Sequence, residues 1–170
     1  MKKILLLFLV VATAMTTVVS VSSAGSSIGG GLHYLHAVKD IDKNTTLDKN
    51  SFSILGSYMF GLGLVSVEAQ VEYVFNYAGT DHSMWTPSAW AVTHGLIYAG
   101  AGIGIGYSNG DWQDDPFYAL RAGVNLPLAA FKLDAYATYQ FQNGGQLKTV
   151  TGEDLDSVTL AAILRFPLGK

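Results

Sequence analysis

A chain of 170 residues with a formal net charge of −3 has the size of one domain and lacks the basic balance typical of nucleic-acid binding. It contains no cysteine, so disulfides cannot hold an exported form together. Although 49% of its residues are hydrophobic, no run of about 18 apolar residues after residue 24 predicts a transmembrane helix.

The N-terminal segment has the pattern of a secretory signal peptide. Lys2 and Lys3 form a basic start, residues 4–12 are apolar, and Ser22-Ser23-Ala24 has the small residues of a cleavage site. We expect cleavage after Ala24, with an uncleaved membrane anchor as the alternative. The predicted organisation is therefore a signal peptide over 1–24 and one domain over 25–170.

The remaining chain shows a hydrophobic period of two instead of the helical period of 3.6, which predicts an all-β protein. Several segments are about ten residues long, close to what a tilted strand needs to cross a bilayer. In chain order we predict eight strands: Ser27–Val38, Ser51–Phe60, Leu64–Phe75, Pro87–Thr93, Leu96–Tyr107, Phe117–Leu126, Phe131–Gln142 and Ser157–Leu168.

The connections between these segments alternate between long and short. The first, third, fifth and seventh are long and contain every acidic residue outside the predicted strands, whereas "GLG", "HG" and "PLAA" are short. In an antiparallel meander, alternate connections lie at opposite ends. Long loops at one end and short periplasmic turns at the other are typical of an eight-stranded antiparallel up-and-down transmembrane β-barrel. Both termini are then expected in the periplasm.

The segment "LVSVEAQVEYVFN" (64–76) indicates which face of the sheet meets lipid. Its apolar residues alternate with Glu68 and Glu72, so one face is apolar and the other is charged. Alternation in the other strands completes a polar face with three acidic and three basic residues, which predicts a lumen plugged by a charge network: Glu68, Glu72, Arg121, Lys132, Asp134 and Arg165. The alternative is a soluble β-sandwich, where these would be surface ion pairs of little energetic weight, but its apolar face would need a second covering layer.

On three stretches, "IGGGLHYLHAV", "LIYAGAGIGIGYSNGDWQDDPFYALRAGVNL" and "VTLAAILRFPL", the chain resembles the small eight-stranded outer-membrane barrels. These are the OmpA-, OmpX- and OmpW-like domains and the "outer membrane protein beta-barrel domain" group of Gram-negative bacteria. The last stretch is similar to their C-terminal assembly signal, although Phe166 does not end this chain. The resemblance implies a location in the cell outer membrane. The partners it implies are outer-membrane lipids, lipopolysaccharide and the outer-membrane assembly machinery.

Candidates for catalytic or metal chemistry are weak. His33 and His36 are three residues apart and face opposite sides of a strand, and His82 and His94 lie in connections at opposite ends, so no metal site is predicted. His36 lies near the outer rim but has no identifiable serine partner. The glycines of "YAGAGIGIGYSNG" precede no helix, so we interpret them as close packing opposite Tyr136 and Arg121 and not as a phosphate loop. We expect no cofactor and no enzyme activity.

The expected function is that of a monomeric structural or interaction scaffold that presents acidic extracellular loops. Eight strands enclose an interior just wide enough for side chains to fill, which favours a plugged lumen. The alternatives are a narrow porin-like channel for small solutes and a lipid A-modifying enzyme.

Overall fold

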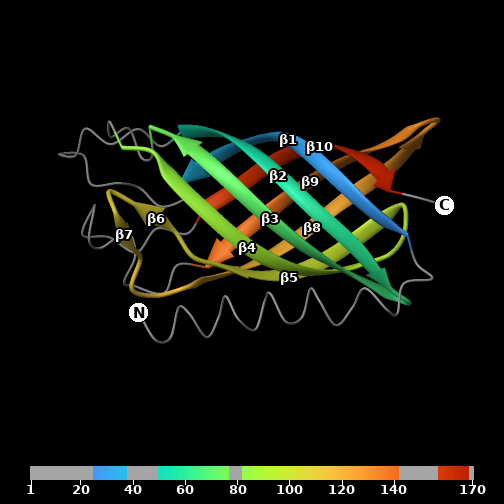
Figure 1. Cartoon of the computed structure of the whole chain (residues 1–170), viewed down its shortest axis with the longest axis horizontal. Coiled ribbons are helices and arrows are strands. Elements are labelled where there is room, and N and C mark those ends of the chain that lie inside the picture. The colour runs from blue at the N-terminus through green and yellow to red at the C-terminus, as the bar shows by residue number, and fades with distance from the viewer. Residues whose placement is uncertain (1–24, 38–49, 77–81, 142–156, 169–170) are drawn as a thin grey trace.

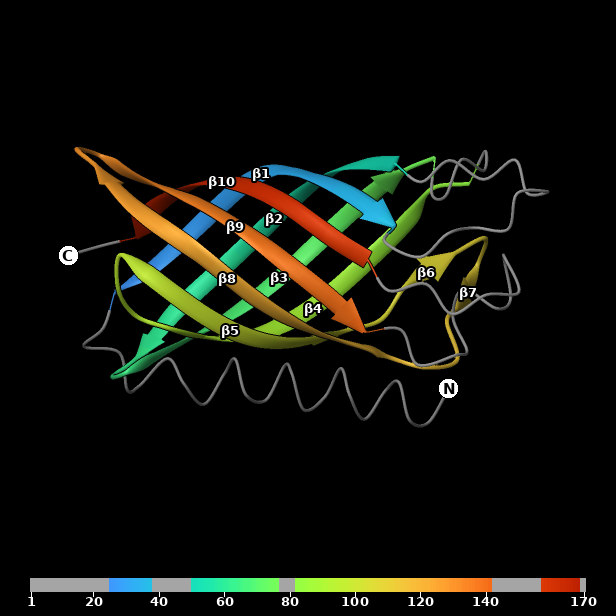
Figure 2. The same ribbon diagram turned by 180° about the vertical axis from the view of Figure 1, so that it is seen from behind.

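The computed structural model describes residues 25–37, 50–76, 82–141 and 157–168. In these ranges the chain forms one ten-stranded sheet (Figures 1 and 2). The strands are β1 (Ser26–Ala37), β2 (Asn50–Leu62), β3 (Val65–Phe75), β4 (Met84–Thr93), β5 (Ile97–Gly104), β6 (Tyr107–Ser108), β7 (Asp111–Trp112), β8 (Phe117–Leu128), β9 (Phe131–Phe141) and β10 (Ser157–Leu168). The predicted signal peptide over 1–24, and the predicted strand ends Val38 and Gln142, lie outside the described residues. No helix in the described ranges has the length and apolar character of a membrane span.

Eight of the strands close into an antiparallel barrel. Their order is β3-β2-β1-β10-β9-β8-β5-β4, and a further pairing of β3 with β4 joins the two ends. Only the pair β1–β10 joins strands that are distant in sequence, from Ser26 opposite Leu168 to Ala37 opposite Ser157. The predicted fold class is therefore confirmed: the chain is an eight-stranded up-and-down barrel.

Three short turns lie at one end of the barrel, together with Ser26 and Leu168 (right-hand end in Figure 1). The turn between β2 and β3 contains Gly63 and the turn between β4 and β5 contains Gly95, both at positive φ (68° and 140°), a conformation that glycine adopts without strain. The turn between β8 and β9 spans only residues 129–130. We call this end the turn end and the opposite end the loop end.

Two strand boundaries differ from prediction by three residues, and the other differences within the described residues are of one or two. β5 stops at Gly104, and the predicted continuation to Tyr107 instead enters a small hairpin, in which Asn109 and Gly110 (φ 55° and 91°) form a two-residue turn between β6 and β7. Asn-Gly favours this geometry because both turn residues need positive φ. β4 begins at Met84, three residues before the predicted start, so that Pro87 lies inside the strand.

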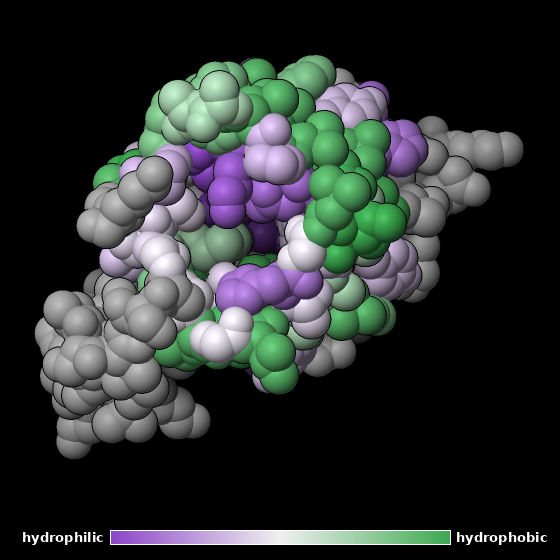
Figure 3. All heavy atoms as spheres, turned by 90° about the vertical axis from the view of Figure 1, so that its right-hand side faces the viewer, coloured by the Kyte–Doolittle hydropathy of each residue, from purple (hydrophilic) through white to green (hydrophobic). Residues whose placement is uncertain are grey.

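The barrel has an apolar outer surface and a polar interior. Outward side chains such as Leu32 and Phe52 are 65% and 64% exposed, whereas the inward carboxylate Glu68 is fully buried. Seen from the turn end, a hollow lined by hydrophilic residues lies within a largely hydrophobic outer surface (Figure 3). A strand of 12 residues such as β1 is about 40 Å long, and a tilt of about 40° reduces its span to about 30 Å, the thickness of a bilayer's hydrocarbon core.

Candidate functional site: the charged lumen

Four strands, β3, β8, β9 and β10, contribute six polar side chains to the centre of the barrel. Glu68 and Gln70 come from β3, Arg121 from β8, Asp134 and Tyr136 from β9, and Arg165 from β10. Each projects inward because the alternation of a strand places every second side chain on the same face. All six are buried.

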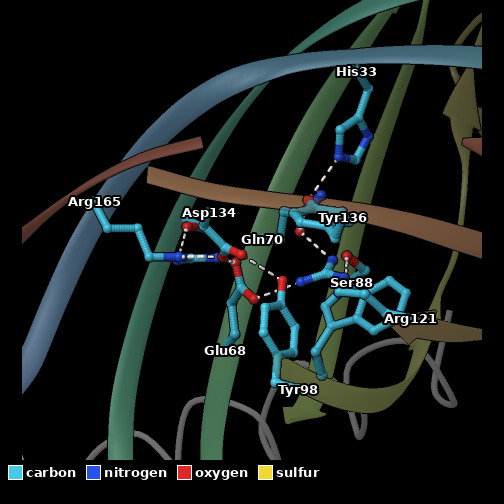
Figure 4. Close-up of polar contacts among 11 residues, drawn as sticks. His33, Glu68, Gln70, Ser88, Tyr98, Arg121, Asp134, Tyr136 and Arg165 are labelled. Atoms are coloured by element: carbon cyan, nitrogen blue, oxygen red, sulfur yellow. Dashed lines mark hydrogen bonds and ion pairs between the residues drawn. The ribbon is translucent and has the colours of Figure 1, made fainter. Parts of the chain in front are cut away.

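Arg165 binds two carboxylates. Its Nε donates to Asp134 Oδ2 at 2.7 Å and its Nη2 to Glu68 Oε1 at 2.8 Å (Figure 4). Its Nη1 donates to Ser57 Oγ at 2.8 Å. The second oxygen of Asp134 accepts a hydrogen bond from the Tyr98 hydroxyl at 2.5 Å. The guanidinium therefore has an acceptor for each of its three nitrogens.

Arg121 holds the other side of Glu68. Its Nη1 donates to Glu68 Oε2 at 2.7 Å and its Nη2 to Gln70 Oε1 at 2.8 Å. Its guanidinium carbon lies 3.8 Å from the ring centroid of Trp90 and 3.9 Å from that of Tyr136, so both rings make cation–π contacts with it.

The glycines of β5 fit this packing, but with partners other than those predicted. A Cβ at Gly102 would overlap the Trp90 ring, one at Gly104 would overlap Phe117, and one at Gly100 would lie 2.5 Å from Val92 Cγ1. The sequence-based interpretation of close packing in a narrow lumen therefore fits, whereas its choice of Tyr136 and Arg121 as the opposing groups is corrected to Trp90, Phe117 and Val92.

The four central charges balance. Glu68 and Asp134 oppose Arg121 and Arg165, and none of the four is more than 2% exposed. Burial of an unpaired charge is very unfavourable, so a stable lumen requires each charge to have an opposite partner. Glu68 meets this requirement twice, because it bridges both arginines. We call these four residues the plug.

Glu72 belongs to a separate cluster, nearer the loop end. It accepts a hydrogen bond from Ser53 Oγ and lies 3.0 Å from His33 Nδ1. His33 Nε2 is 2.7 Å from the Tyr136 hydroxyl, which connects this cluster to the plug. Glu72 therefore pairs with a histidine and a serine, and no contact between Glu72 and either arginine occurs among the described residues.

Lys132 lies outside the network, which corrects its predicted place. It has the same inward parity as Asp134 but stands at the turn end, opposite Pro127 of β8 and Arg165 of β10, where its side chain is exposed. The alternation of a strand predicts which face of the sheet a side chain lies on, but not how deep in the lumen it lies. It therefore could not distinguish a residue at the mouth of the lumen from a buried one.

His33, Trp90 and Tyr98 are among the lumen residues that sequence reasoning did not assign to the lumen. Alternation carries a signal for His33, because its sequence neighbours Leu32 and Tyr34 are the apolar and aromatic side chains expected on the outward face.

The remaining histidines do not form a metal centre within the described ranges, where no group of three or more metal-ligating residues occurs. His36 Nδ1 lies 3.0 Å from Asn50 Oδ1 on the loop side of β1. At the turn end, His94 Nε2 lies 2.5 Å from Ser66 Oγ, a serine–histidine contact that the sequence did not predict.

Comparison with known proteins supports the fold at low sequence identity. No protein-family model matches the chain, and no curated protein matches it in sequence. The crystal structure of Neisserial surface protein A (NspA) superposes with a TM-score of 0.64 at 17% identity, covering 84% of this chain and 97% of that one. A de novo designed transmembrane β-barrel superposes with a TM-score of 0.50 at 7% identity, covering 86% of this chain and 98% of the design. The chain therefore has the fold of the small eight-stranded outer-membrane β-barrel proteins.

Proposed function

We propose that this protein is an outer-membrane barrel whose lumen is closed by a charge network and which acts as a structural and interaction scaffold. The observation that carries the proposal is the double ion pair of Glu68 with Arg121 and Arg165. In the closed order of strands, β3 is three strands from β10 in one direction and three strands from β8 in the other. The two ion pairs therefore cross the interior in two directions and obstruct its cross-section.

The passage of ions through the plug is also energetically unfavourable. Ions that pass would have to displace charge-assisted hydrogen bonds of 2.7 to 2.8 Å between fully buried groups. The rings of Trp90 and Tyr136 fill the space on both sides of the Arg121 guanidinium. An eight-stranded barrel has little further space, because its interior is about as wide as its side chains can fill.

The outer surface supports the proposed location and partners. Its apolar side chains would contact membrane lipids and the acyl chains of lipopolysaccharide, and the assembly machinery of outer-membrane barrels would insert the chain.

The closed barrel pairs each of its eight strands on both edges, which favours a monomer. Exposed Asp111, Asp114 and Asp115 lie at the loop end, which we propose faces the cell exterior. The other acidic residues of the predicted long loops lie outside the described residues.

Conductance in planar bilayers tests the proposal. The purified wild-type protein should show little or no single-channel conductance, because the ion pairs of Glu68 with Arg121 and Arg165 cross the lumen. A large and stable conductance would contradict the plugged scaffold and favour the porin-like channel. The proposal includes no catalytic step, so expression should leave the mass of lipid A unchanged, and a changed mass would favour the lipid-modifying alternative.

A further inference from the structure

Between the plug and the loop end, the lumen contains a cavity of about 600 Å³, counting space open to solvent. We call this cavity the vestibule. Its lining includes His33 of β1, Glu72 of β3, Thr86 of β4, Phe117 of β8, and Thr138 and Gln140 of β9. Trp90, which stacks on Arg121, lies at its inner end, so the plug separates the vestibule from the turn end.

The vestibule wall contains buried hydroxyl groups without partners. Among the described residues, the hydroxyls of Thr86 and Thr138 are buried and make no hydrogen bond, and both residues line the cavity. Ser51 and Ser157, which stand on the same inward face at the loop-end starts of β2 and β10, are also unpaired. These four hydroxyls have no hydrogen-bond partner within the described protein, so those of Thr86 and Thr138 are available to a molecule in the cavity.

The charges and rings of the vestibule restrict what could satisfy these hydroxyls. No lysine or arginine lines the cavity, because Arg121 and Arg165 are bound to carboxylates within the plug. The one carboxylate, Glu72, is held by His33 and Ser53. Phe117 adds an apolar surface, and its ring lies against the wall at Gly104, where a Cβ would collide with it.

We propose that the vestibule binds a small neutral molecule with several hydroxyl groups, of the monosaccharide class. Sugar hydroxyls both donate and accept hydrogen bonds, as do the threonine hydroxyls and the amide of Gln140, and the C–H face of a sugar ring packs on an aromatic ring. An anion would find no cation in the lining, and a cation would compete with His33 for Glu72. Because the plug closes the inner end, the site would retain its ligand on the loop side without passing it on. This inference goes beyond the scaffold proposal. Binding in the vestibule does not depend on the conductance result, whereas retention of the ligand on the loop side rests on the proposed plug.

The test measures binding of D-glucose to the full barrel in a detergent without sugar headgroups. Trp85→Phe and Trp112→Phe leave Trp90, at the inner end of the vestibule, as the single tryptophan reporter. We expect a saturable change in its fluorescence with glucose and none with inorganic phosphate or methylammonium. Thr86→Val and Thr138→Val should each weaken binding about fivefold, the effect of one neutral hydrogen bond.

Two further results separate a ligand site from an ordinary polar wall. Thr138→Val should leave the denaturant midpoint unchanged or raise it, because it removes an unpaired buried hydroxyl, while it weakens glucose binding. Ser66→Ala is the matched control: Ser66 is also a buried inward hydroxyl but lies at the turn end, so glucose affinity should not change. Absence of saturable glucose binding, or equal binding in the valine variants, would overturn the proposal. Methylammonium binding that Glu72→Gln abolishes would overturn it in favour of a cation site.

Discussion

Replacing Arg121 by alanine should destabilise the barrel and let ions through. The change removes a fully buried cation that donates to Glu68 and Gln70 at 2.7 and 2.8 Å, so the plug would hold two carboxylates against Arg165 alone. Breaking a buried ion pair from one side costs about 3–5 kcal/mol, and loss of the stacking on Trp90 and Tyr136 adds about 1 kcal/mol. Removing the guanidinium would also open space at the centre of the lumen, so conductance should rise.

The identity of the rescuing mutation makes this prediction specific. Glu68→Gln in the Arg121→Ala background restores a balance of one cation, Arg165, to one anion, Asp134, and should recover part of the lost stability. Glu72→Gln is the matched control, because Glu72 contacts His33 and Ser53 and should give no comparable recovery. Equilibrium unfolding in detergent measures stability, and planar bilayers measure conductance. Wild-type stability and conductance in Arg121→Ala, or equal rescue by both glutamine variants, would refute the plug as described.

Three further outcomes are expected. Lys132→Ala should change the free energy of unfolding by less than about 0.5 kcal/mol, because the Lys132 side chain is exposed. Asp134→Ala should lower it by about 3–5 kcal/mol, because it breaks a buried ion pair with Arg165. Equal losses in the two variants would indicate that Lys132 belongs to the charge network. Gly31→Ala should cost about 1–3 kcal/mol in an unfolding titration, because the new Cβ would overlap the carbonyl oxygen of Ala162 where β1 meets β10. Gly56→Ala, which meets nothing within 4 Å, should be tolerated, and a similar loss there would contradict the packing argument. On gels, detergent-folded protein should migrate differently before and after boiling; identical migration, together with solubility without detergent, would favour a soluble sandwich.

Much of the fold could be predicted because its signals are local. The alternation around Glu68 and Glu72 identified both faces of β3, and the contrast between short turns and long connections indicated an antiparallel meander with an even number of strands. The small hairpin of β6 and β7 was missed although Asn109-Gly110 is a strong turn signal, because the segment was read as one long loop. The predicted ends of the strands were less accurate than the strands themselves. Proline often lies at the first residue of a strand, but Pro87 lies within β4.

The pairing within the lumen could not be predicted in the same way. Glu68 meets Arg121 and Arg165 across 53 and 97 residues of sequence, and Glu72 meets His33 instead of an arginine. The sequence alone determined which side chains point inward, because the period of two is a property of each strand by itself. Which of these inward side chains lie at the same level along the barrel axis is determined only by the closed barrel. The stagger of the strands around the barrel places Asp134 within reach of Arg165 in its centre and leaves Lys132, two residues away on the same face, exposed at its mouth.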